Sequence, residues 1–314
     1  MPAIVITEFM DEAAVADLAR SHDVLYDPAL VDKPEALHAA LASARALIVR
    51  NRTQVRPALL ADAPHLACVG RLGVGLDNID LPACAARSIA VYPATGANDV
   101  AVAEYVIASA LILLRGAYAA TAAVAEGQWP RNALMGREIS GSVLGLVGFG
   151  AIARETALRA KGMGMEIIAH DPFVPDAHPA WTRFHTQSVA LAELLQRADI
   201  ISLHVPLTEG TRNIVNATSL ASMKPGAILI NAARGGVVDE AALAAALRGK
   251  KLGGAALDVF ELEPLDAGRG AIFAGCPNLI LTPHIAGVTV ESNTRVSWLI
   301  ARKVTEHLAG LAKP

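Results

Sequence analysis

Three polar side chains, Arg234, Glu263 and His284, each follow an apolar run with strand character in the second half of the sequence. Ligands of open α/β sheets bind outside the carboxyl ends of the strands, so all three are expected to face one crevice. An arginine there can bind a carboxylate through two hydrogen bonds and polarise the adjacent carbonyl. A histidine can exchange a proton with the carbonyl oxygen. A carboxylate beside the imidazole orients it and favours its charged form.

Each residue taken alone also has an ordinary explanation. Arg234 could pair with a surface carboxylate, Glu263 could belong to a solvated loop, and His284 could be a hydrogen-bonded loop histidine. Together, beside a nicotinamide, they form the set that hydride transfer to a 2-oxo acid requires. The hypothesis therefore depends on a dinucleotide site nearby.

Residues 142–150 (SVLGLVGFG) supply the pattern for such a site. Gly148 and Gly150 permit a sharp turn and a close approach to phosphate, Phe149 lies between them, and the small Ala153 lets the next helix pack on the strand. The pyrophosphate is expected at that helix's N-terminus. A second apolar run ends at Asp171, about 20 residues on, where a carboxylate holds the ribose hydroxyls of NAD and repels the 2′-phosphate of NADP.

Composition excludes several other classes of function. The 314 residues carry a formal net charge of −3 and have a pI near 6.3, which argues against nucleic acid or an anionic membrane as partner. The three cysteines lack CxxC spacing, so we expect reduced thiols, a cytoplasmic protein and no metal site. The N-terminus reaches acidic residues too early for a secretory signal, and the longest uncharged apolar run, 105–114, is too short to span a bilayer.

Alternation of apolar runs with helical segments predicts an α/β protein with two Rossmann-like domains, each a doubly wound parallel sheet. In the first part we expect strands at 3–7, 47–50 and 89–92, a further apolar run at 65–69, a helix at 11–20 and a short helix before residue 89. In the second we expect strands at 142–147, 165–170, 199–205, 227–232, 254–259 and 279–281, and helices at 98–120, 188–197, 218–223 and 239–247, the last with Asp239 as N-cap. The helix at 291–308 is expected to return to the first sheet. The smaller domain is then discontinuous, 1–97 plus 288–314, and encloses a nucleotide domain at 98–287.

Arginines at the ends of apolar runs in the small domain indicate the substrate. Arg50 and Arg71 end such runs and Arg52 lies close by, so we expect them to bind a second anionic group at the far end of the substrate, although plain surface charge is the alternative. A second GxG, at Gly73 and Gly75, is followed by Asn78 and only a short helix. It is interpreted as a substrate loop, with an ordinary turn as the alternative.

Several longer motifs resemble signatures of the D-2-hydroxyacid dehydrogenase family, and the similarity covers essentially the whole chain. The motifs are residues 71–80 (RLGVGLDNID), 204–208 (HVPLT), 230–240 (INAARGGVVDE), 257–264 (LDVFELEP) and 281–287 (LTPHIAG). The resemblance implies Arg234 as substrate anchor, His284 as acid/base and Glu263 as its partner. It implies NAD contacts from Gly148, Phe149, Gly150, Ala151, Ile152, Asp171, His204, Val205, Pro206, Ala232, Ala233, Arg234, Asp258, His284 and Gly287. It implies substrate contacts from Arg50, Arg52, Arg71, Leu72, Gly73, Val74, Gly75, Arg234 and His284.

The arginines at positions 50 and 71 are those that phosphoglycerate dehydrogenases of this family use for phosphate. Arg52 and the segments 8–12, 49–53, 129–131 and 287–293 look more similar to a subgroup that acts on (S)-sulfolactate. The resemblance implies an NAD-dependent homodimer, with 98–120 and the Trp129 region as interface, that interconverts a D-configured 2-hydroxy acid and its 2-oxo acid. Sulfolactate/sulfopyruvate is expected first, 3-phosphoglycerate and then hydroxypyruvate or glyoxylate next. Because the chain ends soon after its last helix, we expect no appended regulatory domain. A corepressor-like NAD(H) sensor is the alternative of another class.

Overall fold

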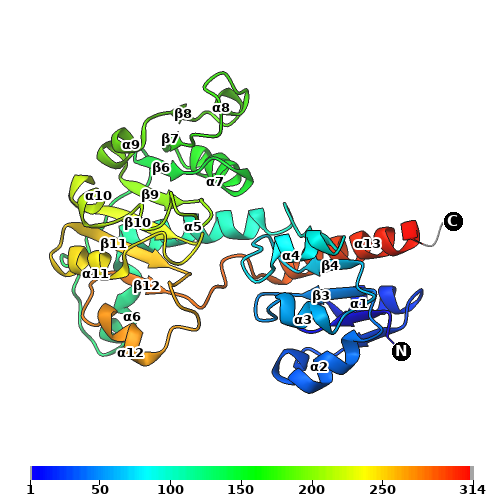
Figure 1. Cartoon of the computed structure of the whole chain (residues 1–314). Helices are drawn as coiled ribbons and strands as arrows, with labels where there is room; N and C mark the ends of the chain where they lie inside the picture. The colour runs from blue at the N-terminus through cyan, green and yellow to red at the C-terminus, as the bar shows by residue number, and fades with distance from the viewer. Residues whose placement is uncertain (1, 312–314) are drawn as a thin grey trace. The chain divides into compact units, whose positions relative to one another are not determined.

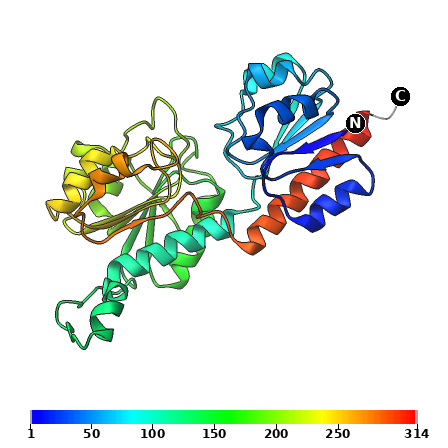
Figure 2. The same ribbon diagram turned by 90° about the horizontal axis from the view of Figure 1, so that it is seen from below.

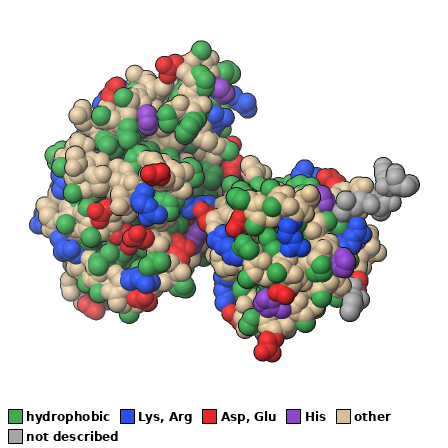
Figure 3. Space-filling view, viewed as in Figure 1, with side chains coloured by type: hydrophobic (Ala, Val, Ile, Leu, Met, Phe, Trp, Pro, Cys, Tyr) green, Lys and Arg blue, Asp and Glu red, His purple; other side chains and the backbone are tan. Residues whose placement is uncertain are grey.

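The computed structural model describes residues 2–311, and these form two compact units (Figure 1). One unit consists of Met1–Asn98 and Gly287–Pro314, and the other of Asp99–Ala286. Each unit is built on one parallel sheet. We call the first the five-stranded unit and the second the seven-stranded unit, after the number of strands in its sheet. Acidic and basic side chains are interspersed on the visible face of both units, consistent with a net charge close to zero (Figure 3).

The five-stranded sheet has the strand order β2-β1-β3-β4-β5, and every pair is parallel. Its strands are β1 (Ile4–Ile6), β2 (Val24–Tyr26), β3 (Ala46–Val49), β4 (Cys68–Arg71) and β5 (Ala90–Pro93). The order reverses between β1 and β3, and ligands of such sheets bind at this switch point, beyond the carboxyl ends of the strands. The turns that follow β1 and β3 are therefore the places to look for a binding site.

Helices cover both faces of this sheet. They are α1 (Glu12–Ala19), α2 (Pro34–Leu41), α3 (Pro57–Ala61), α4 (Leu81–Ala86) and α13 (Val290–Leu311). Asp11 caps α1 by accepting from the backbone N–H groups of Ala13 and Ala14. As expected, α13 returns to the first sheet: Val296, Ile300 and Val304 pack in one core with strand residues of β1, β3 and β4, and α13 lies along the sheet in Figure 2.

The seven-stranded sheet has the order β12-β11-β10-β9-β6-β7-β8, again all parallel. Its strands are β6 (Val143–Val147), β7 (Glu166–His170), β8 (Gln187–Ser188), β9 (Ile200–Leu203), β10 (Ala227–Asn231), β11 (Leu252–Leu257) and β12 (Leu279–Leu281). The switch point lies between β6 and β9. The strands that precede the three candidate catalytic residues, β10, β11 and β12, are neighbours at one side of the sheet, because buried apolar strands joined by helical crossovers pair in sequence order there.

The principal helices of this unit are α5 (Asp99–Arg115), α7 (Ala151–Gly162), α9 (Leu191–Arg197), α10 (Ala217–Ser222) and α11 (Glu240–Arg248). Short helical turns are η2 (Ala117–Ala120), α6 (Thr121–Ala125), α8 (Ala180–Arg183), α12 (Ala267–Gly270) and η3 (Ala271–Phe273), with η1 (Leu30–Asp32) in the other unit. Asp239 caps α11 by accepting from the N–H of Ala242, as predicted.

Several predicted boundaries were wrong by two or more residues. The helix expected at 98–120 ends at Arg115, because Gly116 takes a left-handed conformation (φ 59°) and a 3-10 turn follows. The helix expected at 188–197 begins at Leu191, since residues 187–188 pair with β7 as β8. β11 lies two residues earlier than expected, at Leu252–Leu257. In the five-stranded unit β2, α2 and α3 were not predicted; β2 is only three residues long and half-buried.

Within residues 2–311, none of the helices is by itself long and apolar enough to cross a membrane, although the pair Asp99–Arg115 and Ala117–Ala125, bent by 64°, passes that test on length and composition.

Candidate active site

Glu263 and His284 are brought together at the carboxyl end of the seven-stranded sheet. Nδ1 of His284 lies 2.7 Å from Oε2 of Glu263. The second oxygen of Glu263 accepts from the backbone N–H of Phe260 at 3.0 Å, so the carboxylate is held from the loop after β11. The contact leaves Nε2 of His284 as the ring nitrogen that can exchange a proton with a substrate.

The charge of Glu263 is stabilised by its surroundings. Burial alone raises the pKa of this carboxyl, but the hydrogen bonds from His284 and Phe260 and the positive charges of His284 and Arg234 outweigh it and lower the pKa. An ionised Glu263 accepts a hydrogen bond at Nδ1 of His284 and so holds the ring in place, and a protonated histidine is the form that donates a proton to a carbonyl oxygen.

Asp258 holds the loop that carries His284. Its side chain, 1% exposed, accepts from the backbone N–H groups of Ile285 and Ala286, both at 2.8 Å, and from the hydroxyl of Thr282 at 2.7 Å. Tyr105, on α5, lies 2.6 Å from the same hydroxyl. His284 itself has a φ of 54°, in the left-handed region that non-glycine residues adopt uncommonly. Tyr105 and Thr282 were not identified from the sequence, because single hydroxyl groups carry no spacing pattern.

Arg234 lies in a tight loop after β10. Asn231 accepts from the N–H of Ala233 and donates to the carbonyl of Arg234, which closes the turn. Gly235 follows, and a Cβ at that position would lie 1.8 Å from the carbonyl oxygen of Phe260. The glycine therefore lets the loop of Arg234 approach the loop that carries Glu263. The electrostatic influence of Arg234 on the pKa of Glu263 reflects this proximity.

The glycine loop after β6 has the geometry of a dinucleotide site. Gly148 has φ 92°, and a Cβ there would lie 2.5 Å from the carbonyl of His204, beyond the end of β9. The N–H of Phe149 donates to Asp171 at 2.8 Å, which ties the ends of β6 and β7 together. A Cβ at Gly150 would meet no described atom within 4 Å, and Gly150 directly precedes α7. Open space next to a helix N-terminus fits a pyrophosphate, and the Asp171 carboxylate lies beside the same loop, where it could bind the ribose hydroxyls.

The remaining predicted cofactor residues lie around this loop or on neighbouring strand ends. His204 and Val205 follow β9, and Ala232 and Ala233 follow β10. Burial lowers the pKa of His204 to about 4, so this imidazole is neutral, and its Nε2 lies 3.0 Å from the hydroxyl of Ser202. Ala151 and Ile152 begin α7. Gly287 belongs to the five-stranded unit, where its carbonyl accepts from Ser292. Contacts of these residues with NAD remain predictions.

In the five-stranded unit, Arg50 follows β3 and Arg71 ends β4, and Val49 pairs with Arg71 in the sheet. The guanidinium of Arg50 donates to the carbonyl of Phe9 at 3.1 Å and to Oδ1 of Asn293, and lies over the ring of Phe9. These described partners are all neutral. The guanidinium of Arg71 lies over Gly73, where a Cβ would be 1.4 Å from Nη1.

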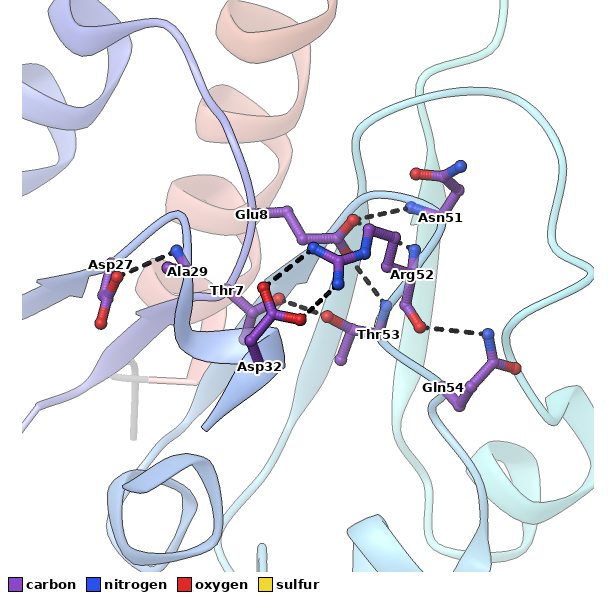
Figure 4. Close-up of polar contacts among 9 residues, drawn as sticks. All are labelled: Thr7, Glu8, Asp27, Ala29, Asp32, Asn51, Arg52, Thr53 and Gln54. Carbon is purple, nitrogen blue, oxygen red and sulfur yellow. Dashed lines mark hydrogen bonds and ion pairs between the residues drawn. The ribbon is translucent and has the colours of Figure 1, made fainter. Parts of the chain in front are cut away.

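Arg52, the third predicted arginine, is differently engaged. Its guanidinium forms a two-pronged ion pair with Asp32, at the end of η1 (Figure 4). Both side chains are exposed. Leu72 is buried with its N–H bonded to Val49, and Val74 and Gly75 are half-buried in the following loop. The structure thus leaves Arg50 with neutral partners, while the charge of Arg52 is balanced by a carboxylate.

Glu8 is the polar residue of this region whose role the sequence did not reveal. Its buried carboxylate accepts from the backbone N–H groups of Arg50, Asn51, Arg52 and Thr53. Figure 4 shows Glu8 with the last three of these residues. The sequence placed Glu8 in a segment, 8–12, that resembles the sulfolactate subgroup, but a glutamate directly after an apolar strand is equally typical of a solvated turn, so no role was assigned to it.

Comparisons with known proteins agree with this geometry. A family model described as the NAD-binding domain of D-isomer-specific 2-hydroxyacid dehydrogenases matches residues 107–286. The chain is 57% identical over 308 residues to (S)-sulfolactate dehydrogenase of Chromohalobacter salexigens, covering 98% of this chain and 99% of that protein. It is 38% identical over 312 residues to D-3-phosphoglycerate dehydrogenase of Mycobacterium tuberculosis, covering 99% of this chain and 57% of that protein.

Among solved structures, D-lactate dehydrogenase of Aquifex aeolicus, in complex with NAD and lactic acid, superimposes with a TM-score of 0.84. The two sequences are 26% identical, and the alignment covers 98% of this chain and 96% of that one. The parallel sheets, the glycine loop with Asp171 and the paired Glu263 and His284 are thus accompanied by similarity along nearly the full length. The chain belongs to the D-isomer-specific 2-hydroxyacid dehydrogenase family.

Proposed function

We propose that (S)-sulfolactate and sulfopyruvate are the substrate pair of this NAD-dependent 2-hydroxyacid dehydrogenase. The observation that carries the proposal is the arrangement around Arg50, whose guanidinium is held by the carbonyl and ring of Phe9 and by Asn293. Segments 8–12, 49–53 and 287–293, far apart in the sequence, converge on this one side chain. These are the segments that resemble sulfolactate dehydrogenases, and the (S)-sulfolactate dehydrogenase relative is 57% identical.

The seven-stranded unit supplies the groups that act on the 2-oxo acid. When bound, NADH supplies the hydride. Arg234 binds the substrate carboxylate by forked hydrogen bonds and polarises the carbonyl. His284 donates a proton to the carbonyl oxygen during reduction and removes it during oxidation. Glu263 holds Nδ1 of that imidazole at 2.7 Å and so orients the ring.

The five-stranded unit supplies the group that selects the substrate. A guanidinium hydrogen-bonded only to neutral acceptors retains its positive charge for an anion, and Arg50 meets this condition among the described residues. Burial lowers the pKa of Arg50 and the nearby charge of Glu8 partly opposes this effect, and arginine stays charged at neutral pH. A sulfonate carries a single charge and three acceptor oxygens, which suits one such guanidinium with Arg71 on the adjacent strand.

A panel of NADH-oxidation assays tests the proposal, with sulfopyruvate, 3-phosphohydroxypyruvate, hydroxypyruvate, glyoxylate and pyruvate as substrates. We expect the highest kcat/KM with sulfopyruvate. Arg50→Ala or Arg71→Ala should lower kcat/KM for sulfopyruvate much more than for glyoxylate, because glyoxylate has no second anionic group. Equal losses on both substrates would refute the anion site.

The second candidate substrate is 3-phosphoglycerate, favoured by the 38% identity to a D-3-phosphoglycerate dehydrogenase and by the positions of Arg50 and Arg71. The ion pair between Arg52 and Asp32 argues against this substrate. A phosphate monoester carries about −1.5 to −2 charge at pH 7, so it gains more from a second guanidinium than a sulfonate does. Here the second guanidinium, that of Arg52, is already paired with a carboxylate. Hydroxypyruvate and glyoxylate follow. Tight NADH binding without oxidation by any 2-oxo acid would instead favour a sensor.

We also propose that the enzyme is a homodimer. Large apolar side chains in and after η2 and α6 face solvent, with Tyr118 66%, Trp129 79% and Met135 81% exposed. This segment projects from the body of its unit (Figure 2). An exposed apolar cluster on a projecting segment is typical of a protein interface.

The thiols of Cys68, Cys84 and Cys276 are unpaired, which supports a cytoplasmic location.

A further inference from the structure

Glu8 occupies the switch point of the five-stranded sheet. It follows β1, and the loop 50–53 follows β3, the two strands between which the order reverses. Ligands of sheets with this topology bind at that point. A carboxylate in such a place is unexpected for a site that binds an anion, because like charges repel. Its hydrogen bonds explain why it is there.

Both oxygens of Glu8 are occupied by the backbone of the loop. Oε1 accepts from the N–H groups of Arg50 at 2.9 Å and Thr53 at 3.0 Å, and Oε2 accepts from Asn51 at 3.3 Å and Arg52 at 3.0 Å. Burial would raise the pKa of Glu8, but the backbone bonds from Thr53, Arg50 and Arg52 and one from the Thr53 side chain outweigh it and lower the pKa. The carboxylate is therefore ionised at neutral pH and satisfied.

The carbonyl side of the loop is fastened as well. Nδ2 of Asn78 donates to the carbonyl of Thr53 at 2.8 Å and to that of Arg50 at 3.3 Å. The hydroxyls of Thr7 and Thr53 lie 2.7 Å apart. Four consecutive backbone N–H groups of the loop thus donate to the Glu8 carboxylate, while the carbonyls at both ends of the loop accept from the Asn78 amide. Such a loop has little freedom, and the direction in which Arg50 leaves the backbone is set by it.

The occupied carboxylate also explains why Arg50 does not form an ion pair with Glu8. The four N–H donors fill the positions that a guanidinium would otherwise take, so the guanidinium turns to Phe9 and Asn293. Residues Glu8 and Phe9 therefore hold Arg50 at both ends: Glu8 holds its backbone N–H, and Phe9 holds its guanidinium through a carbonyl and a ring. The guanidinium is thereby positioned with no carboxylate hydrogen-bonded to it among the described residues, while the charge of Glu8 still acts on it from the loop.

We propose that Glu8 is a positioning residue that determines specificity for 2-oxo acids with a second anionic group. It acts through the loop 50–53, which it fixes so that Arg50 presents its guanidinium to that group. The inference rests on the proposed function for its substrate class, but its structural part, the fixing of the loop by Glu8, can be measured without any substrate.

Two variants test it. Glu8→Gln removes the charge and replaces one acceptor oxygen by an NH2 group, which opposes the loop N–H donors. Glu8→Asp keeps the charge but shortens the side chain by one methylene, so it cannot reach all four donors. Asp11→Ala is the matched control: Asp11 also accepts from two backbone N–H groups in the same unit, but caps α1 instead of the loop. Thermal unfolding checks that each variant is folded.

The first measurement is hydrogen–deuterium exchange of the peptide that contains residues 50–53. We expect at least tenfold faster exchange there in Glu8→Gln, an intermediate increase in Glu8→Asp, and none in Asp11→Ala. Unchanged exchange in a folded Glu8 variant overturns the proposal. If Glu8→Gln does not fold, the Glu8→Asp result decides.

The second measurement is steady-state kinetics with sulfopyruvate and glyoxylate. We expect KM for sulfopyruvate to rise at least tenfold in Glu8→Gln, with a much smaller change in kcat and in KM for glyoxylate. If hydrogen–deuterium exchange becomes faster but KM rises equally for sulfopyruvate and glyoxylate, Glu8 has no role in specificity and its role is purely structural. If the wild-type enzyme itself prefers glyoxylate, the proposed substrate class fails, while the exchange result still decides whether Glu8 fixes the loop.

Discussion

Nδ1 of His284 lies 2.7 Å from Oε2 of Glu263, although the two residues come from loops after different strands. Three features make the contact possible. β11 and β12 are paired, the Asp258 side chain binds the loop after β12, and the backbone N–H of Phe260 donates to the other oxygen of Glu263. The imidazole is thereby oriented before any substrate binds, so no ordering of this side chain is needed during the reaction.

His284→Ala should abolish most of the turnover and leave the cofactor bound. We expect kcat to fall about 10²- to 10⁴-fold, the usual contribution of a positioned acid/base, while NADH binding followed by fluorescence titration persists. His185→Ala is the control, because His185 also has a left-handed backbone (φ 50°) in the same unit but no predicted role. If His284→Ala turns over as fast as this control, the histidine is not the acid/base.

Two glycines of the same loop should respond differently to alanine. At Gly148 a Cβ would clash with the carbonyl of His204 and φ is 92°, so Gly148→Ala should destabilise the protein by about 2 kcal/mol or more. At Gly150 a Cβ meets no described atom within 4 Å, so Gly150→Ala should leave Tm nearly unchanged. It should nevertheless weaken NADH binding at least tenfold, because the methyl group enters the space proposed for the pyrophosphate. Unimpaired NADH binding by Gly150→Ala would argue for another cofactor position.

Asp32→Asn should shift preference from sulfonate to phosphate. The substitution releases Arg52 from its ion pair, so a second guanidinium becomes available on the loop. Because exposed ion pairs are weak, we expect kcat/KM for 3-phosphohydroxypyruvate to rise only about two- to fivefold relative to sulfopyruvate. Asp27→Asn is the control, since Asp27 pairs with Lys33 instead and lies nearby (Figure 4). The idea fails if both variants change the ratio equally.

The stabilising effect of Glu8 should depend on pH in one direction. Its pKa is lower in the folded protein than the ordinary 4.5, so its contribution is complete above pH 4.5 and is lost as pH falls through the folded value. At pH 7 we expect Glu8→Gln to be less stable by about 3 kcal/mol, since buried N–H donors lose a charged acceptor. The difference in Tm between wild type and variant, measured by calorimetry, should narrow below pH 4.5. A gap that widens on acidification would contradict the lowered pKa.

Much of the fold could be predicted because its signals are local. Buried parallel strands appear as continuous apolar runs, and Asp11 and Asp239 mark helix starts through their own side chains. The dinucleotide loop is likewise a local pattern, in which Gly148, Ala153 and Asp171 occupy fixed spacings. What local signals missed were short elements stabilised by neighbours: β8 has two residues and exists only through pairing with β7.

The sequence alone was sufficient for the family and the cofactor, because their motifs depend on residue type and distance along the chain. The roles of Arg234, Glu263 and His284 were proposed from the same kind of pattern and stay predictions. It could not separate Arg50 from Arg52, which stand two residues apart on the same loop. Only the tertiary structure pairs Arg52 with Asp32, places Asn293 from the last helix against Arg50, and directs four N–H groups at Glu8. These contacts join segments up to 243 residues apart in the sequence. Whether an arginine in this loop is paired with a carboxylate depends on which distant residues the fold places beside it, and neighbouring sequence does not determine that.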